Sequence, residues 1–172
     1  EVMHTLIISP PGMGKTTLLR DIARQLSNGF RNFNGVKVSI VDERSEISGC
    51  YKGVPQNDIG YQTDVLDACP KAEGIMMIIR SMSPNVIITD EIGREEDMDA
   101  IEEAQNGGVK IITSAHGSDV GDVLKRPILK QVVDRGFFDR ILVLGNSRGI
   151  GTLEKVYDGR ERTQILSSPI KL

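Results

Sequence analysis

Short apolar runs alternate with longer amphipathic stretches along most of the chain. Four nearly continuous, β-branched runs predict strands that are buried on both faces. These runs cover residues 5–8, 36–41, 85–89 and 109–113. Apolar positions at helical spacing predict helices over residues 15–27, 72–82, 95–106 and 120–134. Strands that alternate with helices are typical of an α/β fold, in which a mainly parallel sheet is flanked by helices.

The last part of the chain has a different pattern. Residues 140–144 and 151–157 alternate apolar and polar side chains on either side of the turn segment 145–149, which predicts an antiparallel hairpin at the sheet edge. The polar residues after Asp158 are expected to pair with this hairpin or to fray. Residues 45–70 are rich in Gly, Asp, Gln and Pro and have weak periodicity, so we expect a long loop there.

The length of the chain indicates a single domain. Of its 172 residues, 39% are hydrophobic and 26% are charged, so the chain is expected to form one folded unit over 1–172. The sequence begins without an initiator Met and reaches its first predicted strand after a few residues. We therefore expect that an N-terminal portion of the natural protein is absent.

The charge balance and the short apolar runs narrow the range of partners. A net charge of −3 gives no extended basic surface, so no nucleic-acid partner is expected. No apolar run approaches the roughly 20 residues that span a bilayer, so no direct membrane insertion is expected. The two cysteines form no CxxC pair, which favours reduced thiols in a cytoplasmic protein.

The segment after the first predicted strand has the composition of a phosphate-binding loop. It reads Ser9-Pro10-Pro11-Gly12-Met13-Gly14-Lys15-Thr16-Thr17 and opens a predicted helix. Glycines let backbone N–H groups point at phosphate oxygens, and the helix N-terminus adds a positive dipole end. Lys15 is expected to contact the β- and γ-phosphates of ATP, and the Thr16 hydroxyl to bind Mg²⁺. Ser9 stands where the pattern GxxxxGK[ST] has its first glycine, and its small side chain is expected to preserve the loop.

An acidic pair follows the predicted strand at 85–89. A carboxylate at the carboxyl end of a parallel strand lies near the ligand crevice of an α/β sheet. We expect Asp90 to hold Mg²⁺, directly or through water, and Glu91 to act on the attacking water as general base or orienting group. The alternative is that both carboxylates merely cap the next helix. Beside a phosphate loop, the pair favours hydrolysis over phosphoryl transfer to a small acceptor.

His116 follows the predicted strand at 109–113. If this strand lies between the phosphate-loop strand and the acidic-pair strand, its end faces the γ-phosphate. We then expect His116 to sense the γ-phosphate by a hydrogen bond and to join Lys15 and Glu91 in the catalytic group. The alternative is a purely structural histidine.

The order of these motifs resembles that of the type II and type IV secretion ATPases. The matching runs are 9–17, 41–46, 79–85, 90–94 and 114–117. That family carries a phosphate loop, an acidic box, a second acidic strand and a His box in this order. The resemblance implies a P-loop NTPase with a RecA-like (ASCE) core that works as a homo-oligomer, which in that family is a hexameric ring.

Two longer runs, 41–58 and 90–97, look like the signature of an ATPase family that acts at stage III of sporulation in spore-forming bacteria. This resemblance implies ATP hydrolysis on the mother-cell side of the forespore boundary. It also implies membrane-embedded sporulation channel or secretion proteins as partners. The chain would then be cytoplasmic and peripheral at the membrane through those partners.

The resemblance to secretion ATPases suggests further site residues. Asp42, Glu43 and Glu46 correspond to the acidic box, which implies a role in ordering Mg²⁺ or water, and a solvated loop is the alternative. Arg94 stands one residue later than the arginine of the family pattern. Arg80, just before the second acidic strand, is better placed in sequence to contact the γ-phosphate or a neighbouring subunit.

Three other functions stay open on the sequence alone. The first is an AAA+-like ATPase in another assembly or remodelling role. The second is a nucleotide or small-molecule kinase, which predicts an arginine-rich lid that the sequence does not show. The third is a non-catalytic nucleotide-dependent scaffold, against which the presence of Glu91 argues.

Overall fold

The computed structural model describes residues 1–172, which fall into two compact units. Unit 1 comprises Glu1–Lys15, Glu91–Glu95 and Ile112–Leu172, and unit 2 comprises Thr16–Asp90 and Glu96–Ile111. The expectation of a single domain over 1–172 stays a prediction.

The structure confirms the predicted α/β class. One mostly parallel sheet of eight strands has the order β10-β9-β8-β1-β7-β6-β4-β5, and β2 and β3 pair separately. The strands are β1 (Thr5–Ser9), β2 (Gly29–Phe30), β3 (Phe33–Asn34), β4 (Val38–Asp42), β5 (Thr63–Asp67), β6 (Val86–Glu91), β7 (Lys110–His116), β8 (Arg140–Gly145), β9 (Thr152–Asp158) and β10 (Ile170–Lys171). The helices are α1 (Lys15–Asn28), α2 (Lys71–Ser81), α3 (Glu95–Asn106), α4 (Val120–Val123) and α5 (Pro127–Asp134).

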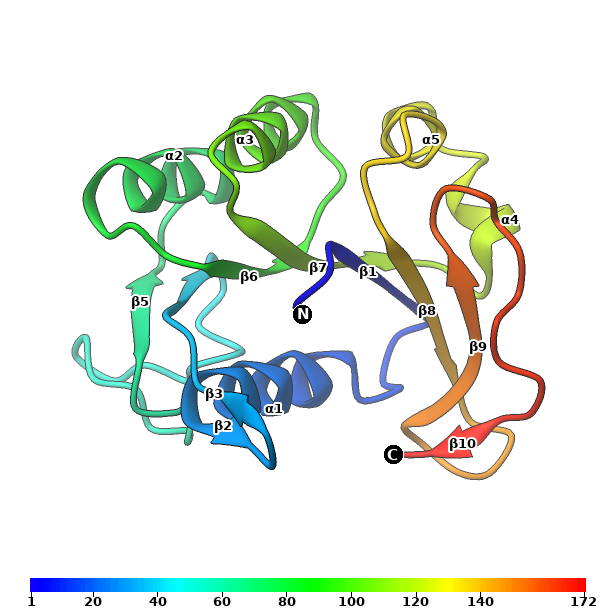
Figure 1. Cartoon of the computed structure of the whole chain (residues 1–172), viewed down its shortest axis with the longest axis horizontal. Helices are drawn as coiled ribbons and strands as arrows, with labels where there is room; N and C mark the ends of the chain where they lie inside the picture. The colour runs from blue at the N-terminus through cyan, green and yellow to red at the C-terminus, as the bar shows by residue number, and fades with distance from the viewer. The chain divides into compact units, whose positions relative to one another are not determined.

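In unit 1, β1 lies between two parallel neighbours. It pairs with β7 on one side and with β8 on the other, and its residues Leu6, Ile7 and Ile8 are fully buried. β8 pairs antiparallel with β9, and β9 pairs antiparallel with β10. The predicted C-terminal hairpin is therefore confirmed, and the tail returns to it as strand β10 (Figure 1).

In unit 2, β4 lies between β6 and β5 and runs parallel to both. All five residues of β4 are buried. Figure 1 shows the reason, since α1 covers one face of these strands and α2 and α3 cover the other. This two-sided burial is the environment that the continuous apolar run predicts.

The prediction of a loop over 45–70 is wrong in its last third, because strand β5 occupies Thr63–Asp67. β5 pairs in parallel with β4 from Val38↔Thr63 to Asp42↔Asp67. All five of its residues are only half-buried, as expected for the last strand of a sheet. Hydrogen bonds to the buried strand β4 stabilise the extended conformation of β5, although the apolar pattern of these residues is weak.

The helix predicted over 120–134 is in fact two helices, α4 and α5. Pro127 lacks a backbone N–H and restricts the residue before it to extended conformations. Arg126 accordingly has φ −94° and ψ 119° and separates the two helices. No helix in the structure combines the length and the apolar composition needed to cross a membrane.

Candidate functional site

The predicted phosphate loop connects β1 to α1. Ser9 is fully buried, and its hydroxyl donates a hydrogen bond to the carbonyl oxygen of Pro10 (2.8 Å). Gly12 and Gly14 have φ +71° and +85°, a conformation that glycine adopts without strain. A Cβ added to Gly12 would meet no atom within 4 Å. The space beside Gly12 is therefore open to a ligand, and Ser9 is accommodated within the turn.

Lys15 and Glu91 lie together where this loop ends. Lys15 Nζ is 3.7 Å from Glu91 Oε2, and Arg126 Nη1 is 4.0 Å from Glu91 Oε1. The Lys15 side chain is 19% exposed and that of Glu91 is 40% exposed. The structure thus brings two of the three predicted catalytic residues to ion-pair distance in unit 1.

His116 lies at the end of β7, beside the start of the phosphate loop. The parallel register pairs Ser9 with His116, and the Gly117 N–H donates to the Ser9 carbonyl oxygen (3.2 Å). On the other side of β7, the Ile92 N–H donates to the Ser114 carbonyl oxygen (2.9 Å). The strand that carries His116 therefore lies between β1 and the segment that begins with Glu91, as the γ-phosphate-sensing hypothesis requires.

The tip of the β8–β9 hairpin approaches the phosphate loop. A Cβ added to Gly14 would lie 3.8 Å from Gly151 Cα and 3.9 Å from Ile150 Cγ2. Lys171 Nζ donates to the Ile150 carbonyl oxygen, and the Leu172 N–H donates to that of Gly151 (3.2 Å). Lys171 and Leu172 thus bind the hairpin tip that lies beside the loop.

In unit 2, Asp90 forms an ion pair with a buried lysine. Lys71 Nζ lies 3.2 Å from Asp90 Oδ1 and 3.5 Å from Glu43 Oε2, and the Lys71 side chain is 7% exposed. Burial raises the pKa of the Asp90 carboxyl above its usual range, although Lys71 acts in the opposite direction. Thr16 and Thr17 lie in the first turn of α1. The assignment of Thr16 and Asp90 to Mg²⁺ stays a prediction.

Asp42, from the predicted acidic box, is fully buried and faces the following loop. Its carboxylate accepts hydrogen bonds from the Glu46 N–H (2.9 Å), the Ser48 N–H (2.8 Å) and the Ser48 hydroxyl (2.6 Å). Glu46 is exposed and Glu43 is half-buried. The structure therefore gives Asp42 a part in holding the loop, and the predicted role of the box in ordering Mg²⁺ or water stays a prediction.

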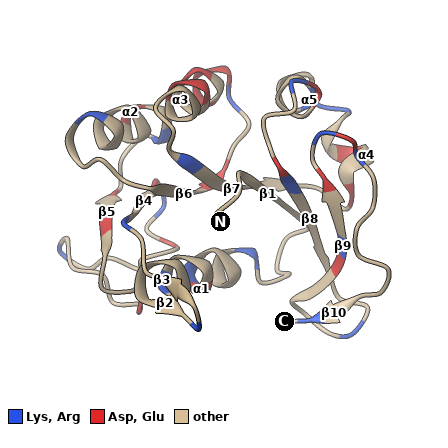
Figure 2. Ribbon diagram, viewed as in Figure 1, with Lys and Arg blue, Asp and Glu red and all other residues tan.

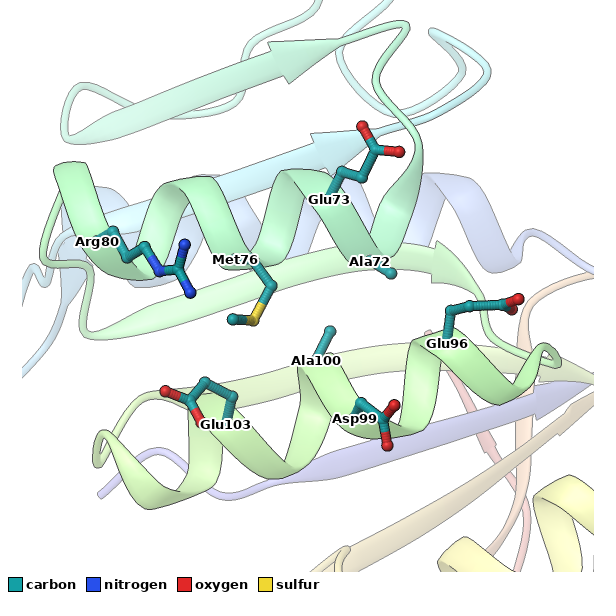
Figure 3. A pocket seen from close by; sticks show the side chains of 8 residues that line it. All are labelled: Ala72, Glu73, Met76, Arg80, Glu96, Asp99, Ala100 and Glu103. Atoms are coloured by element: carbon teal, nitrogen blue, oxygen red, sulfur yellow. The ribbon is translucent and has the colours of Figure 1, made fainter.

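The two predicted arginine contacts lie at exposed positions. Arg80 lines a groove of about 430 Å³ between α2 and α3, where the side chains of Met76 and Ala100 point toward one another (Figure 3). Acidic residues occupy six of the twelve positions of α3, which Figure 2 shows in red. Arg94 is exposed in the turn before α3. The roles assigned to Arg80 and Arg94 stay predictions.

Two site residues were not singled out by the sequence. Arg126 precedes a proline in what reads as a continuous helix, and Lys71 opens a helix as lysines on protein surfaces often do. Neither carries a local motif. Both are recognised only when the folded chain places them beside Glu91 and Asp90.

The fold is that of the P-loop secretion ATPases. The ATPase DotB of Legionella pneumophila has a similar structure, with a TM-score of 0.60 and 21% identity over 82% of this chain and 40% of that one. The VirB11 ATPase of the Brucella suis type IV secretion system, solved with sulphate, gives a TM-score of 0.59 and 17% identity over 97% of this chain and 47% of that one. At such identities, these likenesses concern the fold.

The chain belongs to the family described as "Sporulation stage III, protein AA", whose model matches residues 1–164. It is 58% identical to the stage III sporulation protein AA of Bacillus subtilis (strain 168) over 156 residues. That alignment covers 91% of this chain and 51% of the relative. The chain therefore spans about half the length of this curated relative.

Proposed function

We propose that this chain is the motor domain of an ATPase that hydrolyses Mg-ATP. The observation that carries this proposal is the distance of 3.7 Å between Lys15 Nζ in the phosphate loop and Glu91 Oε2. A cation suited to phosphate and a carboxylate suited to the attacking water are then adjacent. The fold shared with secretion ATPases supports the same activity.

ATP binding is assigned to the phosphate loop, which comprises Ser9, Pro10, Pro11, Gly12, Met13, Gly14, Lys15, Thr16 and Thr17. The open space beside Gly12 fits a phosphate group. The Thr16 hydroxyl and the Asp90 carboxylate are the ligands assigned to Mg²⁺, which offsets negative charge on the phosphates when bound.

Glu91 is assigned as the general base of hydrolysis. It accepts a proton from the attacking water, whose oxygen forms a bond to the γ-phosphorus while the bond to the β–γ bridging oxygen breaks. The products are ADP and inorganic phosphate. His116, at the end of β7, donates a hydrogen bond to the γ-phosphate and so distinguishes ATP from ADP.

Membership of the family supports the biological role that we propose. We assign the chain to the mother-cell cytoplasm, where it serves a sporulation channel or secretion complex toward the forespore through membrane-embedded partners. The fold of secretion ATPases supports a homo-oligomer, with a hexameric ring as the specific proposal. Arg80 is exposed, so a neighbouring subunit can reach it, which keeps it as the candidate for an inter-subunit contact.

The test of this function is ATP hydrolysis by the wild type and Glu91→Gln, with Glu161→Gln as a matched control at an exposed position. Glu91→Gln removes the base but keeps the size of the side chain. We expect ATP binding to be retained and turnover to fall about 100-fold or more, because general bases contribute at least that factor. The Glu161→Gln variant should match the wild type. Equal rates in wild type and Glu91→Gln would remove Glu91 as base, and binding without turnover in the wild type would favour the nucleotide-dependent scaffold.

A further inference from the structure

Arg126 is held in a fixed backbone position beside the proposed catalytic carboxylate. Its N–H donates to the Val123 carbonyl oxygen (3.1 Å), and its carbonyl oxygen accepts from the Lys130 N–H (2.8 Å). Pro127 follows and restricts Arg126 to its extended conformation. The side chain of Arg126 therefore extends from a backbone position that is held firmly between α4 and α5.

The segment that leads from His116 to Arg126 is itself anchored. The Asp119 carboxylate accepts hydrogen bonds from the Val120 N–H (2.7 Å) at the start of α4 and from Lys155 Nζ on β9 (2.6 Å). Asp122 accepts from the Ser118 N–H (3.1 Å). His116 and Arg126 thus stand at the two ends of one eleven-residue segment that is fixed to β9.

The two oxygens of the Glu91 carboxylate face two different cations. Lys15 Nζ lies 3.7 Å from Oε2 and Arg126 Nη1 lies 4.0 Å from Oε1. Both distances are too long for hydrogen bonds, and the Arg126 side chain is 41% exposed. Exposed pairs of this kind add little to stability. The position of Arg126 beside Glu91 is therefore better explained by a role in the site than by a contribution to folding stability.

The role of Lys15 changes when ATP binds, because its charge is then directed to the β- and γ-phosphates. Glu91 keeps a second cation, Arg126, on its opposite oxygen. A carboxylate that acts on water must be held in a narrow range of orientations for an efficient reaction.

We propose that Arg126 is a positioning residue of the hydrolytic site, supplied by the same protomer as the phosphate loop. It orients the Glu91 carboxylate toward the attacking water while Lys15 contacts the phosphates. This inference rests on the proposed ATPase activity and adds to it a residue that acts through Glu91.

The experiment compares Arg126→Ala with Lys125→Ala, measuring kcat for ATP and the Kd of a fluorescent ATP analogue separately. Lys125 is the matched control, because it neighbours Arg126 but pairs with Asp122 (2.9 Å) on the exposed side of α4. We expect Arg126→Ala to lower kcat about tenfold or more with Kd changed less than about threefold, as for a misplaced catalytic group. Lys125→Ala should retain wild-type kcat and Kd.

Two further readouts separate positioning from a structural role. Added guanidinium ion should restore part of the kcat of Arg126→Ala but leave Glu91→Gln inactive, since only the former keeps the carboxylate. Arg126→Lys, which keeps the charge, should retain more activity than Arg126→Ala. Wild-type kcat in Arg126→Ala overturns the inference, and so does a loss of ATP affinity at unchanged kcat, which would make Arg126 a ground-state phosphate contact.

The two proposals fail in different ways. An inactive wild type, or Glu91→Gln turning over at the wild-type rate, would refute the proposed function and this inference with it. A Glu91-dependent wild type with an unaffected Arg126→Ala variant would refute the inference alone.

Discussion

At the scale of single residues, the Asp42 carboxylate accepts its hydrogen bonds from residues of the loop that follows it. It is fully buried, and three donors from Glu46 and Ser48 converge on its two oxygens. A buried carboxylate without such donors would be strongly unfavourable, so these bonds are the condition for its burial. Asp42 therefore fixes the start of the loop after β4.

We predict that Asp42→Asn destabilises the protein by about 1–3 kcal/mol, because an amide NH₂ then faces donors that lose their acceptor. The control is Ser48→Ala, which removes one donor and leaves the other two bonds, and should cost about 1 kcal/mol. Urea unfolding followed by circular dichroism measures both. A variant Asp42→Asn as stable as the wild type would show that the loop does not depend on this carboxylate.

Residues of the site differ in how far the sequence predicts them. The phosphate loop is contiguous, so its glycines, Lys15 and Thr16 are recognisable from spacing alone. Glu91 and His116 follow from their places after buried strands. Arg126 is different, because its distance to Glu91 depends on the turn at Pro127, which the apolar pattern does not reveal.

At the scale of elements, α2 packs against β4 through a glycine. A Cβ added to Gly74 would lie 2.6 Å from Val41 Cγ1 and 3.3 Å from Cys69 Sγ. The helix can therefore approach the strand closely only because this position has no side chain. Gly121 in α4 offers a contrast, since a Cβ added there would meet nothing within 4 Å.

We predict that Gly74→Ala destabilises the protein by about 1–3 kcal/mol through overpacking, despite alanine's better helix propensity. The matched variant Gly121→Ala should be neutral or stabilise by up to about 1 kcal/mol, because it only restricts the unfolded chain. Thermal unfolding of the two variants measures the difference. A Gly74→Ala variant that melts above Gly121→Ala would contradict the close packing of α2 on β4.

Elements with a strong pattern of their own were predicted to within about three residues at each end, and α3 matches its predicted range of 95–106. β5 was missed because its stability comes from pairing with β4, a contact between residues about 25 positions apart in sequence. The division between α4 and α5 was missed because the apolar repeat is continuous, whereas Pro127 interrupts the helix at Arg126.

At the scale of the whole molecule, carboxyl groups with a lowered pKa are concentrated in unit 1. These groups are Asp119, Asp122, Asp134, Glu154 and Asp158. For Asp158 the cause is donation from the Glu161 and Arg160 N–H groups, with Arg140 nearby. In unit 2, Arg24 lowers the pKa of Asp21, whereas burial raises that of Asp90.

We predict that unit 1 loses more of its stability than unit 2 when the pH falls from 7 to about 3, below ordinary carboxyl pKa values. A carboxyl whose pKa is lowered by folding stabilises the folded state above its unfolded pKa, and this contribution is lost as the pH falls through the folded pKa. Asp90 has the opposite sign, since its raised pKa favours folding at low pH and loses that contribution as the pH rises. Hydrogen exchange, corrected for intrinsic rates at each pH, measures protection in each unit.

The control for this prediction is the same comparison in high salt, which screens exposed ion pairs and should reduce the difference between the units. Earlier loss of protection in unit 2 at low pH would contradict it.

The contact between Gly14 and the β8–β9 hairpin tip also has a practical consequence. Ile150 is 62% exposed beside a loop assigned to phosphate, so a small environment-sensitive dye coupled to a cysteine introduced at this position would serve as an optical reporter of nucleotide occupancy. Changes at Leu172 are expected to disturb the same contact, because that residue donates a hydrogen bond to the Gly151 carbonyl oxygen (3.2 Å). Handles for immobilisation are better attached at a site remote from this hairpin.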